Sequence, residues 1–391
     1  MKPRSGLTIL GSTGSIGQQT LAVMAEQTDL FVYALTAHSQ VDQLISQCEA
    51  VAPHVAVVSD PSQYAALAEG LKMRGLKTEA RAGREALRSV AEADEVSHVM
   101  AAIVGGSGLE PTYAAAAAGK TVLLANKESL VMSGELFLSS IERTGGEVIP
   151  VDSEHNAIFQ CLGNSRAVGS TVAKLLLTGS GGPFLERPMD SFDSITPAEA
   201  CLHPNWSMGR KISVDSATMM NKGLELIEAC FLFGVPSAKI DIVIHPQSVV
   251  HSMVAFEDGS VLAQMGQPDM RTPIASALAW PERMTSGVSP LDFVSGLQLS
   301  FRAPDHDRFP LLDLCRQVAA GGQSVKVALN AANEVAVDAF LQERVRFTDI
   351  ERIVKTTVDA MAIEELPSIE AVLSFDSRCR LEAQRQMTKC F

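Results

Sequence analysis

The feature that most constrains the fold is an alternation of short apolar runs with helical patterns along the first 150 residues. Residues 7–10 form an apolar run, which leads into a glycine-rich turn at 11–17 (GSTGSIG) and a helical pattern at 18–26. Further strands are predicted at 31–36, 54–59, 97–104, 121–125 and 147–151. Strands that alternate with helices build a doubly wound parallel sheet. We therefore expect an α/β chain that begins with a Rossmann-like domain.

The glycine turn is a candidate dinucleotide site. Glycines allow a tight turn and let backbone N–H groups approach a pyrophosphate at the N-terminus of the following helix. The spacing is GxxGxxG rather than GxGxxG, so the turn alone is weak support. The second strand ends in His38-Ser39-Gln40, without the acid that NAD sites usually place there. We expect NADP rather than NAD, with these three side chains available to its 2′-phosphate. For His38, a solvated loop without a ligand is the alternative.

Composition excludes several classes of protein. The formal net charge of −13 and the lack of a long basic stretch argue against nucleic-acid binding. The seven cysteines are scattered and form no CxxC pair, which argues against a disulfide framework or a thiolate zinc site. No uninterrupted apolar stretch is long enough to span a membrane. We therefore expect a cytoplasmic protein with reduced thiols and no membrane partner.

Three carboxylates are candidate metal ligands. Asp152 and Glu154 are expected to extend the strand at 147–151, where side chains at i and i+2 project to the same face. Two acids on one face repel each other unless a cation or water separates them, and a hard divalent metal is the natural cation. The segment 215–225 adds a third acid together with hydroxyl, amide and ammonium groups suited to a phosphate. The alternatives are the polar face of an edge strand for the first two acids, and a surface i,i+3 pair for Lys222 and Glu225.

Several other polar segments have both a functional and a structural interpretation. Asn126, Lys127 and Glu128 follow a predicted strand and face the expected cleft, but Asn126 is also a suitable helix cap. Ser180 lies in a glycine-rich turn that suits a phosphate, although a plain turn is the preferred explanation of this segment taken alone. Trp206 suggests a lid that excludes water.

The second half of the chain is expected to contain a sheet and then a helical bundle. The run 242–254 has strand character, and a matching strand from a second subunit could extend its sheet. His245 and His251 lie in this run and are assigned to an apolar sheet or to a subunit interface rather than to the chemistry. Prolines mark a linker at 283–310, and helices are predicted at 311–319, 325–342, 347–361 and 368–382.

Five motifs taken together resemble the 1-deoxy-D-xylulose 5-phosphate reductoisomerase family. They are residues 11–17 (GSTGSIG), 124–129 (LANKES), 151–156 (VDSEHN), 203–209 (HPNWSMG) and 219–225 (MMNKGLE). The resemblance implies a homodimeric enzyme of the non-mevalonate isoprenoid pathway. Such enzymes use NADPH and Mg²⁺ or Mn²⁺ to convert 1-deoxy-D-xylulose 5-phosphate into 2-C-methyl-D-erythritol 4-phosphate. It also implies an NADPH-binding domain at 1–150, a catalytic, metal-binding and dimerisation domain at 151–282, the linker at 283–310, and a C-terminal helical domain at 311–391.

The same resemblance assigns roles to individual residues. The metal ligands would be Asp152, Glu154 and Glu225, which together with Lys127 and His203 form the expected catalytic set. The substrate would contact Lys127, Ser153, Glu154, Ser180, His203, Ser216, Asn221, Lys222 and Glu225, with Ser180, Ser216, Asn221 and Lys222 nearest its phosphate. The dinucleotide would contact Thr13, Gly14, Ser15, Ile16, Asn126, Glu128 and Gly209, and the end of the second strand adds Ser39 and Gln40 as inferred above. Relatives often have Gly-Lys-Asn where this chain has His38-Ser39-Gln40, so the strength of its NADPH preference stays open.

The expected ligand chemistry agrees with this family. Three carboxylates without a cysteine or histidine cluster select Mg²⁺ or Mn²⁺ over zinc. The ion would act as a Lewis acid during a carbon–carbon rearrangement, by retro-aldol cleavage or an α-ketol shift, and NADPH would then reduce the resulting aldehyde. Two other classes remain: a metal-independent NADPH-linked reductase or semialdehyde dehydrogenase, and a non-catalytic NADP-binding regulator.

Overall fold

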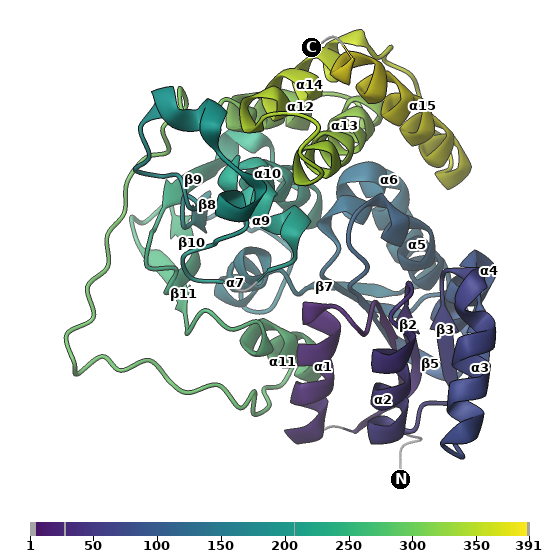
Figure 1. Ribbon diagram of the computed structural model, residues 1–391. Coiled ribbons are helices and arrows are strands. Elements are labelled where there is room, and N and C mark those ends of the chain that lie inside the picture. Colours follow the sequence, from purple (N-terminus) through teal and green to yellow (C-terminus); the bar gives the residue numbers. More distant parts are fainter. Residues whose placement is uncertain (1–4, 27–28, 207, 389–391) are drawn as a thin grey trace. The chain divides into compact units, whose positions relative to one another are not determined.

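The computed structural model describes residues 5–26, 29–206 and 208–388 (Figure 1). The chain divides into two units. Unit 1 comprises Met1–Ser129, Phe137–Asp152 and Met270–Val288. Unit 2 comprises Leu130–Leu136, Ser153–Asp269 and Ser289–Phe391. Ser207, which belongs to the motif at 203–209, and Cys390 lie outside the described residues. None of the described helices is long and apolar enough to cross a membrane.

Unit 1 is built on a seven-stranded sheet in the order β4-β3-β2-β1-β5-β6-β7, and every neighbouring pair is parallel. The strands are β1 (Ser5–Leu10), β2 (Leu30–Ala37), β3 (Val55–Val58), β4 (Glu79–Ala82), β5 (Val96–Ala101), β6 (Thr121–Leu124) and β7 (Glu147–Pro150). The prediction of a doubly wound parallel sheet is confirmed, and β4 is the strand that it missed. β1 pairs with β2 on one side and β5 on the other, so the strand order reverses next to β1, as at a nucleotide-binding switch point.

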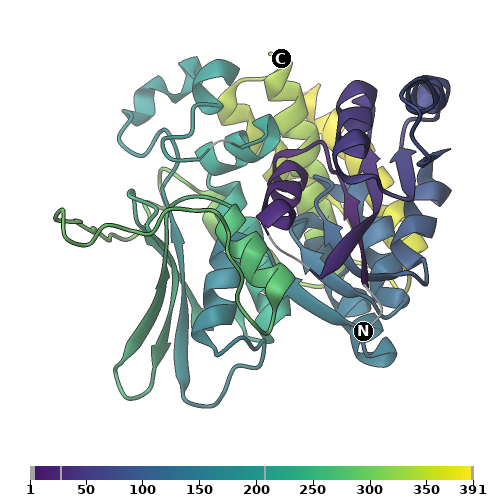
Figure 2. The same ribbon diagram turned by 90° about the horizontal axis from the view of Figure 1, so that it is seen from below.

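Helices connect these strands. They are α1 (Ser15–Glu26), α2 (Val41–Val51), α3 (Tyr64–Met73), α4 (Arg84–Glu92), α5 (Leu109–Ala117) and α6 (Lys127–Thr144), with short 3₁₀ turns η1 (Pro61–Gln63) and η2 (Gly106–Gly108). A later helix, α11 (Arg271–Ala279), packs beside α1 (Figure 2). The inner strands are mostly apolar and buried because helices cover both faces of a parallel sheet, whereas the edge strand β4 (EARA) has no buried residue.

Unit 2 contains a four-stranded sheet in the order β11-β10-β8-β9. Its strands are β8 (Val172–Gly179), β9 (Ile240–Ile244), β10 (Val250–Phe256) and β11 (Val261–Met265), and only the β8–β9 pair is parallel. The predicted continuous strand at 242–254 is wrong, because a turn at 245–249 divides it into β9 and β10. Ser248 in that turn has φ +52°, and its backbone N–H donates to the carbonyl of His245.

The edges of this sheet matter for the predicted sheet extension by a second subunit. β10 pairs with β8 on one side and β11 on the other, so it has no open edge. The outer strands are β11 and β9, and β9 also forms a bridge to Arg302. β11 is therefore the strand of this sheet that could receive a partner strand.

The remaining helices of unit 2 fall into two groups. The first group is α7 (Ser153–Cys161), α8 (Pro197–Ala200), α9 (Arg210–Ala217) and α10 (Met220–Phe233), with 3₁₀ turns η3 (Met189–Ser194) and η4 (Ser237–Lys239). The second is the C-terminal bundle of α12 (Leu311–Ala320), α13 (Gln323–Leu341), α14 (Phe347–Ala360) and α15 (Ile369–Met387). The four C-terminal helices are confirmed. In the bundle, α13 packs against α14 and α15 around the buried rings of Phe340 and Phe375.

Candidate functional site

Asp152 and Glu154 do not share one face of a strand. β7 ends at Pro150, Asp152 directly precedes α7, and Glu154 lies in the first turn of that helix. The prediction of an extended strand is wrong because carboxylates at the start of a helix interact favourably with its N-terminal N–H groups and its dipole. An acid before the helix and another in its first turn are both stabilised there.

The structure nevertheless brings the three predicted metal ligands together. Asp152, Glu154 and Glu225 each offer a carboxylate oxygen, and these oxygens lie within 4.8 Å of one another. Asp152 is the last residue of its segment of unit 1 and is joined by a peptide bond to Ser153, the first residue of α7. Glu225 lies on α10 and is only 1% exposed. Asp215, the other acid in the segment 215–225, is held by Lys211 at 2.7 Å and Asn333 at 2.8 Å instead.

Lys222 lies among these carboxylates. Its Nζ donates to Glu154 Oε1 at 2.6 Å and also to Glu225. The alternative of an exposed i,i+3 surface pair is wrong, since Lys222 is 4% exposed. Burial by itself would lower the pKa of Lys222, but the neighbouring Glu154 and Glu225 carboxylates outweigh it, so the pKa lies above its ordinary value. Lys222 is thus a buried ammonium, and its predicted contact with a substrate phosphate stays a prediction.

Further polar side chains surround the same acids. The Asn221 side-chain amide donates to Glu225 at 2.5 Å, and the Ser153 hydroxyl donates to Glu154 at 2.5 Å. In unit 1, Lys127 Nζ lies 2.6 Å from Asp152, and both side chains are about nine-tenths buried. Each predicted metal ligand therefore has a predicted substrate-contacting residue as a hydrogen-bond or ion-pair partner.

Ser180 and His203 form a second polar group in unit 2. His203 Nδ1 accepts the backbone N–H groups of Asn205 at 3.2 Å and Trp206 at 3.0 Å. In a neutral ring the hydrogen is then on Nε2, which donates to Ser180 Oγ at 2.9 Å. Burial, aided by the Lys222 ammonium and opposed by Glu154, lowers the pKa of His203 to about 4. His203 is therefore a neutral hydrogen-bond donor near pH 7.

Gly179, the last residue of β8, and Gly182, in the loop after it, allow the chain to approach the helices that carry predicted phosphate ligands. Gly182 has φ +71°, and a Cβ there would lie 2.6 Å from the carbonyl oxygen of Ser216. A Cβ at Gly179 would lie 2.9 Å from Cε of Lys222. The loop that carries Ser180 thus passes directly beside Ser216 and Lys222, so three of the four predicted phosphate ligands lie in one region. Asn221, the fourth, is adjacent to Lys222 on α10.

The loop at 203–209 and the histidines of the sheet form another group. The Trp206 ring lies 5.9 Å from the His251 ring, and Asn205 donates to Ser248 Oγ at 2.8 Å. His251 is in β10, as expected, and His245 follows β9 and is bonded to the carbonyl of Ser300 at 2.8 Å. The lid function of Trp206 stays a prediction.

The predicted dinucleotide residues of unit 1 surround the turn between β1 and α1. Thr13 and Gly14 lie in this turn, and Ser15 and Ile16 begin α1. Gly11 has φ +82°, and a Cβ there would lie 2.8 Å from the carbonyl oxygen of Ala102. At Gly17, a Cβ would lie 2.4 Å from the Cα of Ser12. The glycines are therefore needed for the turn itself and for the close packing of α1 on it.

Other predicted dinucleotide residues lie at the ends of β2 and β6. Ser39 and Gln40 are exposed between β2 and α2. Asn126 is the N-cap of α6 and accepts the backbone N–H of Ser129 at 2.6 Å, so its capping role is confirmed. Glu128 is in the first turn of the same helix. Gly209 differs from the others because it belongs to unit 2, at the start of α9.

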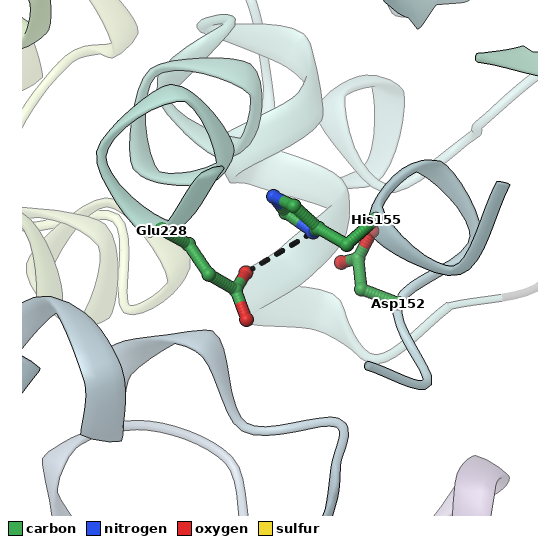
Figure 3. Close-up of side chains that lie close together, drawn as sticks. All are labelled: Asp152, His155 and Glu228. Carbon is green, nitrogen blue, oxygen red and sulfur yellow. Dashed lines mark ion pairs between the residues drawn. The ribbon is translucent and has the colours of Figure 1, made fainter. Parts of the chain in front are cut away.

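Sequence reasoning missed two buried residues beside the carboxylates. His155 follows Glu154 on α7, and its Nδ1 lies 3.3 Å from Glu228 Oε2 on α10 (Figure 3). Figure 3 also shows Asp152 next to this pair, and the three residues form a second group whose ligand atoms lie within 4.8 Å. Their positions in the sequence were the available signal. His155 directly follows the predicted ligand Glu154, and Glu228 lies about one helical turn after the predicted ligand Glu225.

Comparison with known proteins places this geometry in context. Family models match residues 7–134 (1-deoxy-D-xylulose 5-phosphate reductoisomerase), 148–233 (its C-terminal domain) and 265–382 (DXP reductoisomerase C-terminal domain). A 1-deoxy-D-xylulose 5-phosphate reductoisomerase from Pseudomonas putida is 54% identical over 96% of this chain and 94% of its own length. One from Paraburkholderia phymatum is also 54% identical, with the same coverage.

Solved structures agree with the sequence matches. A DOX-P reductoisomerase in complex with NADPH, fosmidomycin and magnesium superimposes with a TM-score of 0.93, at 45% identity over 98% of each chain. The Zymomonas mobilis enzyme in complex with NADPH superimposes with a TM-score of 0.90, at 45% identity over 99% of each chain. These similarities cover both units described above.

Proposed function

Because the chain belongs to the 1-deoxy-D-xylulose 5-phosphate reductoisomerase family, we propose that the site described above performs that family's reaction. The enzyme isomerises 1-deoxy-D-xylulose 5-phosphate and reduces the product with NADPH to 2-C-methyl-D-erythritol 4-phosphate, a step of isoprenoid synthesis. The observation that carries the residue assignment is the convergence of Asp152, Glu154 and Glu225 within 4.8 Å.

The donor set fits a hard divalent cation. All three groups are carboxylates, and Mg²⁺ and Mn²⁺ prefer oxygen ligands over the nitrogen and sulfur ligands typical of zinc. Buried carboxylates this close together repel one another unless positive charge is near, and Lys222 and Lys127 supply only two such charges against three carboxylates. We therefore assign these three acids as ligands of Mg²⁺, which Mn²⁺ could replace.

The chemistry divides between bound groups and side chains. When bound, the metal stabilises negative charge that develops on substrate oxygens, and NADPH supplies the hydride equivalent. Ser180, Ser216, Asn221 and Lys222 hold the phosphate of the substrate. His203 holds a proton on Nε2 and acts as a neutral donor that orients Ser180 or a substrate oxygen. Lys127, 2.6 Å from Asp152, orients that carboxylate and contacts the substrate.

NADPH is assigned to the glycine turn of unit 1. Thr13 and Gly14 lie in the turn before α1, and Ser15 and Ile16 begin that helix, where backbone N–H groups favour a pyrophosphate. The residues after β2 are polar and exposed and include no carboxylate that would repel a 2′-phosphate. Asn126, Glu128 and Gly209 complete the proposed dinucleotide contacts.

We also propose that the enzyme is a cytoplasmic homodimer whose domains follow the sequence boundaries 1–150, 151–282 and 311–391. Apolar side chains support an interface: Phe293 is 63% and Val294 97% exposed in the extended segment at 289–310. Val261 and Leu262 on the outer strand β11 are each about half exposed. A long segment and a sheet edge with exposed apolar groups are suited to pairing with a second copy.

The decisive experiment is a turnover assay of NADPH oxidation with 1-deoxy-D-xylulose 5-phosphate, with and without EDTA. We expect metal-dependent oxidation. Metal-independent oxidation would instead identify a simple reductase, and no oxidation a regulator. Glu225→Gln should abolish the activity that Mg²⁺ restores. Asp241→Asn, which removes an exposed carboxylate from a surface ion pair, is the matched control and should behave as wild type.

A further inference from the structure

The His155 ring connects the two helices that carry Glu154 and Glu225. Its Nε2 lies 2.9 Å from the backbone carbonyl oxygen of Glu225, and its Nδ1 lies 3.3 Å from the carboxylate of Glu228. Both contacts reach α10, one helical turn apart, from a residue adjacent to Glu154 on α7. The ring also stacks on Phe233 of α10, with centroids 6.4 Å apart and an interplanar angle of 24°.

The burial of this group makes its geometry rigid. The side chain of His155 is 0% exposed and that of Glu228 1% exposed. A carbonyl oxygen only accepts hydrogen bonds, so Nε2 carries a hydrogen and is unavailable to coordinate a cation. Nδ1 faces the Glu228 carboxyl group. The proton between them is either on Glu228, which then donates to Nδ1, or on the ring, which then forms an ion pair with the carboxylate. Separating such groups inside a protein is costly, because each would be left without a compensating partner.

We infer that the His155–Glu228 pair is a positioning device that sets the spacing between the Glu154 and Glu225 carboxylates for the metal. This inference rests on the proposed function, since it takes these acids as metal ligands. Hydrogen-bonded groups behind the ligands commonly orient them and tune affinity for the ion. Here the ring acts through the backbone. By bonding to the Glu225 carbonyl, it holds that turn of α10 at a fixed distance from His155, which directly follows Glu154 on α7.

A second metal site is the alternative interpretation, because ligand atoms of Asp152, His155 and Glu228 lie within 4.8 Å of one another. Its one nitrogen ligand and the engagement of Nε2 by a carbonyl favour the positioning role, because a hard cation prefers an all-oxygen set. The two interpretations differ in stoichiometry. Positioning requires one Mn²⁺ per chain, whereas a second site requires two.

The test is a direct measurement of Mn²⁺ binding by calorimetry, together with the melting temperature. Glu228→Leu removes the polar partner at similar volume and should weaken Mn²⁺ binding about 10- to 100-fold. Glu228→Gln keeps a side-chain amide that can donate to Nδ1 of a neutral ring, and should restore affinity to within about threefold of wild type. NADPH binding, measured by fluorescence, should be unchanged in both.

Asp376→Leu is the matched control. It removes another buried carboxylate of unit 2, paired with Arg380 on α15 at 2.6 Å, and should lower the melting temperature without changing Mn²⁺ affinity. Wild-type Mn²⁺ affinity in Glu228→Leu would overturn the inference, as would loss of a second Mn²⁺ equivalent with the first unaltered. If Glu225→Gln also bound Mn²⁺ normally, the metal site itself would be wrong and the inference would fall with it.

Discussion

Replacing Lys222 with methionine separates its electrostatic role from its volume. In the structure the Lys222 ammonium lies between the carboxylates of Glu154 and Glu225, and its Nζ is 2.6 Å from Glu154 Oε1. The Lys222 and Glu225 side chains are 5% and 1% exposed, and that of Glu154 is 19% exposed. Removing one partner of a buried ion pair costs about 3–5 kcal/mol, and the partial exposure of Glu154 favours the lower end.

We therefore expect Lys222→Met to lose about 3 kcal/mol of unfolding free energy in EDTA. For a domain of about 150–250 residues this corresponds to a melting temperature lower by about 6–12 °C. Mg²⁺ should then recover more stability in the variant than in wild type, because the ammonium no longer competes for the same carboxylate oxygens. A ligand at a hundredfold excess over its Kd contributes about 2.7 kcal/mol.

The assay is thermal unfolding followed by circular dichroism, in EDTA and across a Mg²⁺ titration. Lys174→Met is the control: its ion pair with Asp241 has the same 2.6 Å length, but both side chains are nearly half exposed. It should cost less than about 1 kcal/mol, independently of Mg²⁺. Equal Mg²⁺-induced shifts in wild type and Lys222→Met, or an unaltered stability of Lys222→Met in EDTA, would refute the reasoning.

Other expectations follow from the same site. Asp152→Asn should lose nearly all turnover yet bind NADPH in a fluorescence titration; near-normal turnover at limiting Mg²⁺ would remove it from the ligand set. The kcat/KM for NADPH should exceed that for NADH because Ser39 stands where NAD sites have an acid, and an equal value would contradict this. Lys222→Ala should reduce kcat/KM about ten- to a hundredfold with the phosphorylated substrate but much less with its phosphate-free analogue; equal losses would exclude a phosphate anchor. The His203 imidazole, with a pKa lowered to about 4, should stay neutral from pH 8 down to pH 5 and gain a proton only below that, as NMR titration can check.

Local sequence patterns were sufficient for much of the fold. The alternation of apolar runs and helical segments predicted the parallel sheet of unit 1, and apolar spacing near 3.6 predicted all four C-terminal helices to within a few residues. These patterns succeed because strand and helix periodicity are properties of neighbouring residues. The chemical types of the candidate ligands could likewise be read directly, since carboxylates in any fold prefer hard cations.

Tertiary structure alone decided how those ligands are presented. A strand and the beginning of a helix both accommodate Asp152 and Glu154, and the choice depends on where β7 stops pairing with β6. The burial of Lys222 depends on Glu154, which is 68 residues away in sequence. The His155 contact joins residues 70 positions apart. Such contacts depend on where the fold places α7 and α10, and that placement depends on side chains distributed along the whole chain rather than on any local pattern.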